Sequence, residues 1–210
     1  MKDRPTTLFL LRHGETVNTA DGRFRYNGQT DIDVTDRGMV QLKLQAERLK
    51  TRPITSVYSS GLTRSVRGAE TLAGAVGAGV HHDERLKEIH AGRWETLTVD
   101  EVQARFPGEF EARFGDLVNF RIPGGGENLL DVQERAISAL SEIIERHRGE
   151  EIAIVGHGGV NRIILCTAAG IDLSNLLCIE QDFGCLNIIN YWNGAAVVKL
   201  LNQEPYSQTE

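Results

Sequence analysis

A short apolar run near the start of the chain ends abruptly in charged residues. Residues 7–11 read Thr-Leu-Phe-Leu-Leu, the length of a buried strand, and Arg12, His13 and Gly14 follow directly. A buried parallel strand that ends in polar residues is how open α/β sheets place ligand sites. Arg12 offers a planar fork of donors for phosphate or carboxylate, and His13 can serve as base or nucleophile. A strand that merely ends in a surface arginine and histidine is the alternative at this point.

A second apolar run ends in the same way late in the chain. Residues 152–155 read Ile-Ala-Ile-Val and run into Gly-His-Gly-Gly at 156–159, where the histidine is His157. In a parallel sheet both strands end at one edge, so we expect His13 and His157 to share a pocket. A helix is expected just beyond, and its N-terminal N–H groups, near Gly158, would favour a bound anion.

Two further charged residues follow other predicted elements. Residues 54–58 predict a strand and residues 62–76 a helix, which places Arg64 in the first helical turn, within reach of the same edge. A cation is unfavourable at that end of a helix dipole, so a functional demand would explain its position. Two histidines and two arginines on one pocket suit phosphoryl transfer, in which an imidazole nitrogen can attack phosphorus. The leaving alkoxide then needs a proton, and Glu88 is the candidate donor.

The remaining segments alternate between helix and strand patterns. Helices are predicted over 36–50, 98–106, 109–118, 128–148 and 160–169, and strands over 80–83, 186–191 and 195–200. This alternation predicts a mostly parallel sheet covered by helices on both faces. The hairpin signal Asn193-Gly194 adds an antiparallel pair, which makes the sheet mixed. We expect one domain over residues 1–210, with an insertion or lid at about 85–125.

Charge and cysteine usage exclude several classes of protein. The net charge of -6 argues against nucleic acid as a main partner, although an acidic protein can still hold a locally positive anion site. The three cysteines are odd in number and form no CxxC pair, which argues against a disulfide framework or a zinc site and suits the cytoplasm. No run approaches the roughly 20 apolar residues of a membrane span, and the N-terminal apolar run is too short for a secretory signal.

Several motifs occur in one order and together resemble a known family. The chain is similar to the histidine phosphatase (phosphoglycerate mutase-like) superfamily over about residues 7–200. The matching motifs are Leu11-Arg12-His13-Gly14-Glu15-Thr16, Ser59-Ser60 with Arg64, Glu88 ahead of Gly92-Arg93-Trp94-Glu95, Gly125-Gly126-Glu127, and Gly156-His157-Gly158-Gly159. The resemblance implies a three-layer α/β/α sandwich with a mostly parallel mixed sheet. Gly68 departs from the family pattern, and a glycine inside a helix costs about 1 kcal/mol, which predicts a close packing contact there.

The resemblance also implies a role for each matching residue. His13 would be the nucleophile that becomes phosphohistidine, and Glu88 would be the acid/base group. Asn18 would hydrogen-bond the phosphate, and the loop that holds Gly28 and Gln29 would lie on the substrate side. The predicted catalytic residues are therefore His13, Glu88, His157, Arg12 and Arg64, and the predicted phosphate-binding residues are Arg12, Asn18, Gly28, Gln29, Arg64, His157 and Gly158. The family implies no metal and no organic cofactor in hydrolysis.

Three functions remain open at this point. The first is a phosphatase that acts on a small phosphorylated metabolite, because Gly92-Arg93-Trp94-Glu95 resembles the phosphatase branch. The second is a cofactor-dependent phosphoglycerate mutase, whose paired Arg-Arg is missing from residues 85–125. The third is a non-catalytic module that binds a phosphoanion. The substrate stays open between phosphoserine, a sugar phosphate, α-ribazole phosphate, phosphoglycerate and a broad set. A homodimer through the hairpin near residues 186–200 is an alternative to a buried edge.

Overall fold

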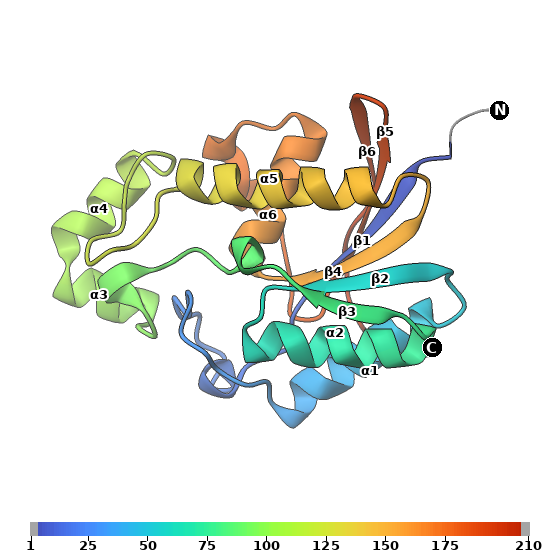
Figure 1. Ribbon diagram of the computed structural model, residues 1–210. Coiled ribbons are helices and arrows are strands. Elements are labelled where there is room, and N and C mark those ends of the chain that lie inside the picture. The colour runs from blue at the N-terminus through green and yellow to red at the C-terminus, as the bar shows by residue number, and fades with distance from the viewer. Residues whose placement is uncertain (1–3, 207–210) are drawn as a thin grey trace.

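The computed structural model describes residues 4–206. A six-stranded sheet lies at the centre of the molecule (Figure 1). The strands are β1 (Thr6–Arg12), β2 (Ile54–Ser59), β3 (Gly79–His82), β4 (Glu151–Gly156), β5 (Leu186–Trp192) and β6 (Ala195–Gln203). They lie in the order β3-β2-β4-β1-β5-β6. The first four run parallel, and β5 is antiparallel to both of its neighbours. The predicted mixed, mostly parallel sheet is confirmed.

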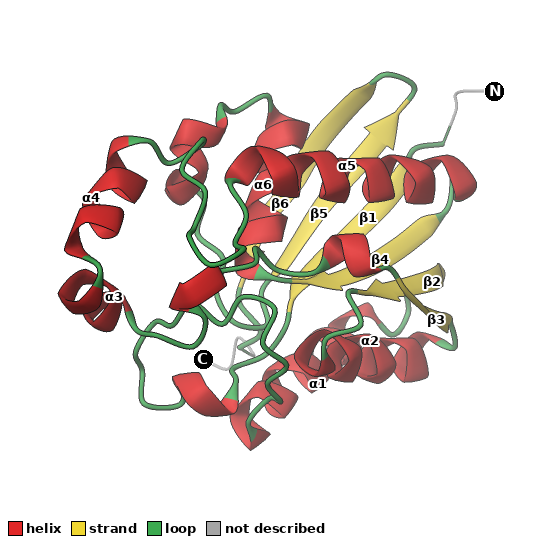
Figure 2. Cartoon of the chain, turned by 60° about the vertical axis from the view of Figure 1, so that its left-hand side comes forward, coloured by secondary structure: helices red, strands yellow, loops and turns green. Residues whose placement is uncertain are grey.

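Helices cover the sheet on both faces, as Figure 2 shows. They are α1 (Asp36–Leu49) and α2 (Thr63–Val76) on one face, and α5 (Leu129–Arg146) and α6 (Gly158–Ala169) on the other. Successive side chains of β1 point to opposite faces, so Leu8 and Leu10 pack with α5 and α6 while Phe9 and Leu11 pack with α1 and α2. The predicted three layers follow from this division. Within residues 4–206, no helix combines the length and apolar surface that a membrane crossing needs.

The segment between β3 and α5 extends beyond the end of the sheet (Figure 1). It carries two short helices, α3 (Val99–Arg105) and α4 (Pro107–Gly115), and has a small core of its own. Trp94 is fully buried in that core, where its ring stacks on Phe120 with centroids 5.8 Å apart. Tyr26, from the loop between β1 and α1, packs against the same cluster. The insertion therefore touches the loop that the sequence assigns to the substrate side.

Some predicted helix boundaries were wrong by a few residues. The expected stop at residue 107 is the first residue of α4, because proline is favoured at the first position of a helix, where its missing N–H has no partner to lose. The same helix ends at Gly115 rather than at residue 118. Helix α6 begins at Gly158, immediately after His157, rather than at residue 160. The earlier start brings the helix N-terminus against the predicted site.

Two glycines of α2 lie in different surroundings. A Cβ on Gly68 would come within 2.8 Å of a Val155 methyl and 2.9 Å of a Leu42 methyl, closer than real Cβ contacts. The predicted close packing at Gly68 is therefore confirmed, and it lets α2 approach both α1 and the sheet. A Cβ on Gly74 would meet nothing within 4 Å.

Strand β6 forms one edge of the sheet. Its side chains alternate between exposed and half-buried, and Val197 and Leu201 are among the exposed apolar residues. Residues 204–206 leave this strand and cross towards α1, where the Glu204 carbonyl accepts a hydrogen bond from Arg48. The edge is thus exposed within residues 4–206, and a homodimer through it stays a prediction.

Candidate active site

The register of the sheet places the two predicted histidines side by side. β1 pairs with β4 so that Arg12 lies opposite Gly156, and the next residues along the two strands are His13 and His157. The backbone N–H of His13 donates to the Gly156 carbonyl at 3.1 Å. The two rings meet edge to face with centroids 5.2 Å apart, and both are buried. Two strands that end in Gly and His thus bring both imidazoles into one pocket.

One hydrogen bond fixes which nitrogen of His13 is free. Nδ1 lies 2.8 Å from the Gly14 carbonyl oxygen, which can only accept, so Nδ1 carries the proton and Nε2 keeps its lone pair. Burial and then the charges of Arg64 and Arg12 hold the pKa of His13 well below its usual range. The imidazole is therefore neutral near pH 7 and presents a nucleophilic Nε2.

A serine sets the tautomer of His157 in the opposite sense. The Ser60 Oγ accepts from the Leu62 N–H at 3.3 Å and lies 2.8 Å from His157 Nε2. Because the hydroxyl proton has no other acceptor within residues 4–206, Ser60 donates it to Nε2. The proton of the ring is then on Nδ1, which is buried and has no partner in the described structure. Burial, Arg64 and the other site residues keep the pKa of His157 well below its usual range. His157 thus offers a neutral N–H donor.

Arg64 reaches the pocket from the first turn of α2 and is fully buried. Its two terminal nitrogens donate to backbone carbonyls of the loop before α1, to Thr30 at 2.8 Å and to Gly28 at 2.5 Å. The Nε atom is buried and has no partner. Burial lowers its pKa, while Glu88 and Asp31 act in the opposite sense. The loop therefore fixes the plane of the guanidinium and leaves the Nε nitrogen without a partner.

Arg12 contacts an aromatic ring, a backbone carbonyl and a glycine. Its guanidinium carbon lies 3.9 Å from the centre of the Phe183 ring, and one terminal nitrogen donates to the Gln181 carbonyl at 2.5 Å. A Cβ on Gly158 would lie 3.4 Å from the same guanidinium. Desolvation lowers the pKa of Arg12 to about 10, so it remains charged at neutral pH. Its Nε is also buried without a partner.

Three unpaired donors distinguish this pocket chemically. Among residues 4–206, the buried side-chain nitrogens without a partner are Arg12 Nε, Arg64 Nε and His157 Nδ1, and the one such oxygen is Asn161 Oδ1. A buried donor without an acceptor costs free energy, roughly 1–3 kcal/mol, unless a ligand supplies the acceptor. Three donors, two of them cationic, suit the nonbridging oxygens of a phosphoryl group.

Glu88 lies at the N-terminus of α6. One carboxylate oxygen accepts from the Gly159 N–H at 3.0 Å and the other from the Ile89 N–H at 2.8 Å. The charge of Glu88 acts on both arginines of the pocket. The anion at this helix N-terminus is therefore the Glu88 carboxylate. Within residues 4–206, no hydrogen bond uses the Gly158 N–H, and Gly158 itself packs on Arg12. Trp94 belongs to the motif that follows Glu88 in the sequence, and it lies in the core of the insertion.

The other predicted phosphate ligands are held by neighbouring side chains and backbone. The Asn18 amide donates to the Asn27 side chain at 2.5 Å and accepts from Thr16 at 3.0 Å. Gly28 contributes its carbonyl oxygen to Arg64. The Gln29 side chain donates to the Glu88 carbonyl oxygen at 3.1 Å, which links the loop to the segment of the proton donor. The structure thus joins Gly28 and Gln29 to Arg64 and Glu88, whereas Asn18 binds Thr16 and Asn27 within its own loop.

Several supporting residues were not predicted from the sequence. Ser60 orients His157, and Phe183 covers Arg12. The Glu95 carboxylate accepts from the backbone N–H groups of Gln29, Thr30 and Ala91, which joins the loop to the insertion. The motif that contains Glu95 was a signal for this role, whereas nothing local marks Phe183.

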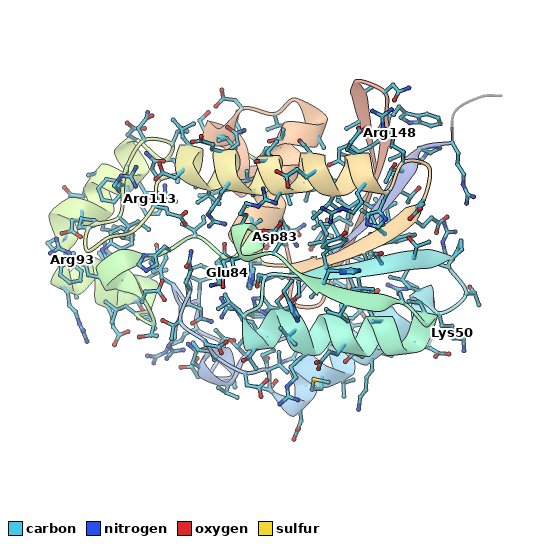
Figure 3. The ribbon with its side chains drawn as sticks, in the orientation of Figure 1. Lys50, Asp83, Glu84, Arg93, Arg113 and Arg148 are labelled. Atoms are coloured by element: carbon cyan, nitrogen blue, oxygen red, sulfur yellow. The ribbon has the colours of Figure 1, made fainter. Side chains whose placement is uncertain are left out.

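The surroundings of the pocket do not resemble a metal site. Within residues 4–206, no three His, Cys, Asp or Glu side chains come together in a way that could hold a metal ion. His81 and His82, side by side in β3, are both exposed. Figure 3 shows that Asp83 and Glu84 lie where the chain leaves β3, and that Arg93 and Arg113 lie further out on the insertion. A groove of about 930 Å³ lies elsewhere, between α5, α6 and the β5–β6 hairpin, and no predicted site residue lines it.

The chain is similar to known proteins in both sequence and structure. The family described as histidine phosphatase superfamily (branch 1) matches residues 8–204. Phosphoserine phosphatase 1 of Hydrogenobacter thermophilus is 34% identical over 197 residues, which cover 93% of this chain and 91% of that protein. Among solved structures, Bacillus stearothermophilus YhfR has a TM-score of 0.84 at 31% identity, covering 93% of this chain and 96% of that one. A mycobacterial glucosyl-3-phosphoglycerate phosphatase has a TM-score of 0.82 at 26% identity, covering 96% of this chain and 100% of that one.

Proposed function

Since this chain belongs to the histidine phosphatase superfamily and is a phosphoric monoester hydrolase, we propose that it cleaves a small-metabolite phosphate monoester through a phosphohistidine on His13. One observation carries the proposal. The free lone pair of His13 Nε2 shares a pocket with three buried donors that have no acceptor. A phosphoryl group would receive the lone pair at phosphorus and the donors at its oxygens.

In the first step His13 displaces the alcohol. Nε2 attacks phosphorus, the P–N bond forms and the bond from phosphorus to the alcohol oxygen breaks. Arg12, Arg64 and the Nδ1–H of His157 stabilise the charge on the nonbridging oxygens in the transition state. The leaving oxygen takes a proton from Glu88. Glu88 lies at the N-terminus of α6 and interacts electrostatically with both arginines. The products of this step are the free alcohol and phosphohistidine.

In the second step water releases the phosphate. The Glu88 carboxylate accepts a proton from a water molecule, the water oxygen attacks phosphorus and the P–N bond breaks. His13 returns to its neutral form, in which Nδ1–H still donates to the Gly14 carbonyl. That hydrogen bond holds the ring plane throughout, and it stabilises the positive charge that the phosphorylated imidazole carries.

This chemistry needs no metal ion, because the side chains already supply the positive charge. Two guanidinium groups face the position of the phosphoryl group, where a metal-dependent phosphatase would place divalent cations. Both arginines have their orientation fixed by backbone carbonyls, so little reorganisation is needed when the charge develops. We therefore expect hydrolysis to continue in the presence of a chelator.

The test is phosphate release from a panel of monoesters in EDTA. The panel contains p-nitrophenyl phosphate, phosphoserine, 3-phosphoglycerate, glucosyl-3-phosphoglycerate, sugar phosphates and α-ribazole phosphate. We expect release from at least one natural monoester, complete loss of release in His13→Ala, and acid-labile, base-stable labelling of the wild-type protein by a phosphate-labelled substrate. The monoester with the highest kcat/KM identifies the substrate class.

Other results would overturn the proposal in defined ways. Unchanged turnover in His13→Ala would remove the nucleophile assignment. Isomerisation of 3-phosphoglycerate without release of phosphate would favour the mutase. Tight phosphate binding without turnover of any ester, in a folded protein, would favour the non-catalytic module.

A further inference from the structure

Arg135 connects α5 to the segment that carries Glu88. Its guanidinium donates to three backbone carbonyl oxygens of residues 85–88. They are those of Arg85 and Lys87, both at 2.7 Å, and that of Glu88 at 3.1 Å. The same guanidinium binds both carboxylate oxygens of Glu127, at 2.7 and 2.8 Å. A planar group with five N–H donors is the one side chain that can serve all these acceptors at once.

Glu127 anchors the other side of this arrangement. Its side chain is mostly buried, and the carboxylate accepts from the backbone N–H of His90 at 2.8 Å. The backbone N–H of Glu127 donates in turn to the His90 carbonyl at 3.0 Å. Arg135 and Glu127 therefore hold the chain on both sides of Glu88, from residue 85 to residue 90, and their charges balance each other.

Glu88 itself is held at two points. Its carbonyl oxygen accepts from Arg135 and from the Gln29 side chain, and its carboxylate accepts from the Gly159 N–H. The first point fixes the backbone from which the side chain starts, and the second fixes where the side chain ends. Without the first, the carboxyl group would keep its chemistry and lose its placement, and a displacement of about 1 Å can cost on the order of 100-fold in rate.

We propose that Arg135 is a positioning residue for the proton transfer: it holds the Glu88 backbone so that the carboxyl group meets the leaving oxygen. The inference rests on the proposed function, because it requires Glu88 to be the proton donor. It also distinguishes Arg135 from the arginines of the pocket. Arg12 and Arg64 would contact the phosphoryl group itself, whereas Arg135 acts on the leaving group through Glu88.

Comparing substrates with different leaving groups separates a positioning role of Arg135 from a purely structural one. An alkoxide needs a proton to leave, whereas p-nitrophenolate leaves without one. A misplaced proton donor therefore slows alkyl monoesters and spares the aryl ester. The charge of Arg135 also acts on His157. Loss of that charge, or of protein stability, would slow alkyl and aryl monoesters alike. The measured quantity is the ratio of kcat/KM for p-nitrophenyl phosphate to kcat/KM for the best alkyl monoester.

The experiment compares Arg135→Met, Arg135→Lys and Glu88→Gln with the wild type. We expect Glu88→Gln to raise the ratio by about 100-fold or more, and Arg135→Met to raise it by about 10- to 100-fold. Arg135→Lys keeps the charge but cannot span the acceptors, so the ratio should be intermediate. Adding Arg135→Met to Glu88→Gln should change the ratio no further, because the group that Arg135 positions is already gone.

Arg85→Met is the matched control. Arg85 lies in the same segment and ties it to the same helix, through Glu142 two turns further along α5, with hydrogen bonds of 2.8 Å. The control should leave the ratio unchanged. An equal rise in Arg85→Met, or an unchanged ratio in both Arg135 variants while Glu88→Gln raises it, would overturn the inference and leave the proposed function standing. An unchanged ratio in Glu88→Gln would instead remove Glu88 as proton donor. If Arg135→Met fails to fold, Arg135→Lys decides alone.

Discussion

Strand β4 has a buried histidine at each end, and the two differ at one nitrogen. His147 precedes the strand, and its Nε2 lies 2.8 Å from the Tyr58 hydroxyl. His157 follows the strand, and its Nε2 lies 2.8 Å from the Ser60 hydroxyl. The other nitrogen of His147 binds the Glu150 carboxylate at 2.8 Å, whereas that of His157 has no partner. Burial and one matching hydrogen bond are thus common to both, and only the second nitrogen separates them.

The difference indicates which features of this protein report function. At the start of β4 the polar groups satisfy one another, as expected of buried groups that stabilise a fold. At its end, three donor nitrogens have no partner within residues 4–206, and two of them belong to arginines. The groove of about 930 Å³ lies near the first end, so the size of a hollow does not mark the site here. A pocket whose buried polar groups lack hydrogen-bond partners does mark the site.

Arg64→Met should break the comparison most severely. It removes one of the unpaired donors and a charge that faces the phosphoryl group, so kcat/KM should fall by roughly 100- to 1,000-fold. Tyr58→Phe is the counterpart at the other end, where it removes the hydroxyl that binds His147 and Arg146. We expect it to lower the free energy of unfolding by about 1 kcal/mol and to leave kcat/KM unchanged. The measurements are steady-state kinetics and urea unfolding of both variants. A loss of turnover in Tyr58→Phe comparable to that in Arg64→Met would show that the two ends are not functionally distinct.

The sequence predicts the main lines of this arrangement because they depend on local patterns. Apolar runs that end in Arg-His-Gly and Gly-His-Gly, together with parallel pairing, bring His13 and His157 to one edge. The partners of the site were not accessible in the same way. The bond from Ser60 to His157, the cover of Phe183 on Arg12 and the seat of Glu88 on Gly159 join residues far apart in the chain. Their geometry depends on how loops and layers pack, and no periodicity encodes it.

The same reason explains why the contacts of the predicted phosphate-binding residues did not follow from the sequence. Arg64 was predicted from its place in a helical turn, yet its orientation comes from carbonyl groups of a loop whose path the sequence does not specify. Gln29 was assigned to the substrate side because its loop matches a family pattern, and the structure adds a hydrogen bond from its side chain to the Glu88 carbonyl oxygen, which the sequence did not predict. Residue identities and strand ends place a pocket, whereas the division of labour among its polar groups follows from tertiary contacts.

The pH dependence of stability should sharpen the comparison at the catalytic end. The pKa values of His13 and His157 lie well below their usual range, chiefly because both are buried. Below about pH 6.5 the unfolded chain binds protons at these residues and the folded protein does not, so stability falls as the pH falls. Each histidine should contribute about 1 kcal/mol between about pH 6.5 and 5.5, and the slope approaches about 1.4 kcal/mol per pH unit until its folded pKa is reached. Urea unfolding of the wild type and of His157→Gln, between about pH 6.5 and 5.5, tests this. An equal slope in the two proteins would contradict the buried neutral state of His157.

The smallest expected effect comes from one methyl group beside Arg12. In Gly158→Ala the new Cβ would lie 3.4 Å from the Arg12 guanidinium and from Arg162 Nη1, at the close limit of ordinary van der Waals contact, so Arg12 should shift by a few tenths of an ångström at most. Because a shift of this size misplaces a phosphate-binding group without removing it, kcat/KM should fall only about 3- to 10-fold. Gly74→Ala is the control, since its Cβ meets open space in α2 and should stabilise the protein by about 0.5–1 kcal/mol without affecting turnover. If Gly158→Ala lowered stability and left kcat/KM intact, the glycine would serve only to let α6 begin beside β1, and the placement of Arg12 would depend on Phe183 and the Gln181 carbonyl alone.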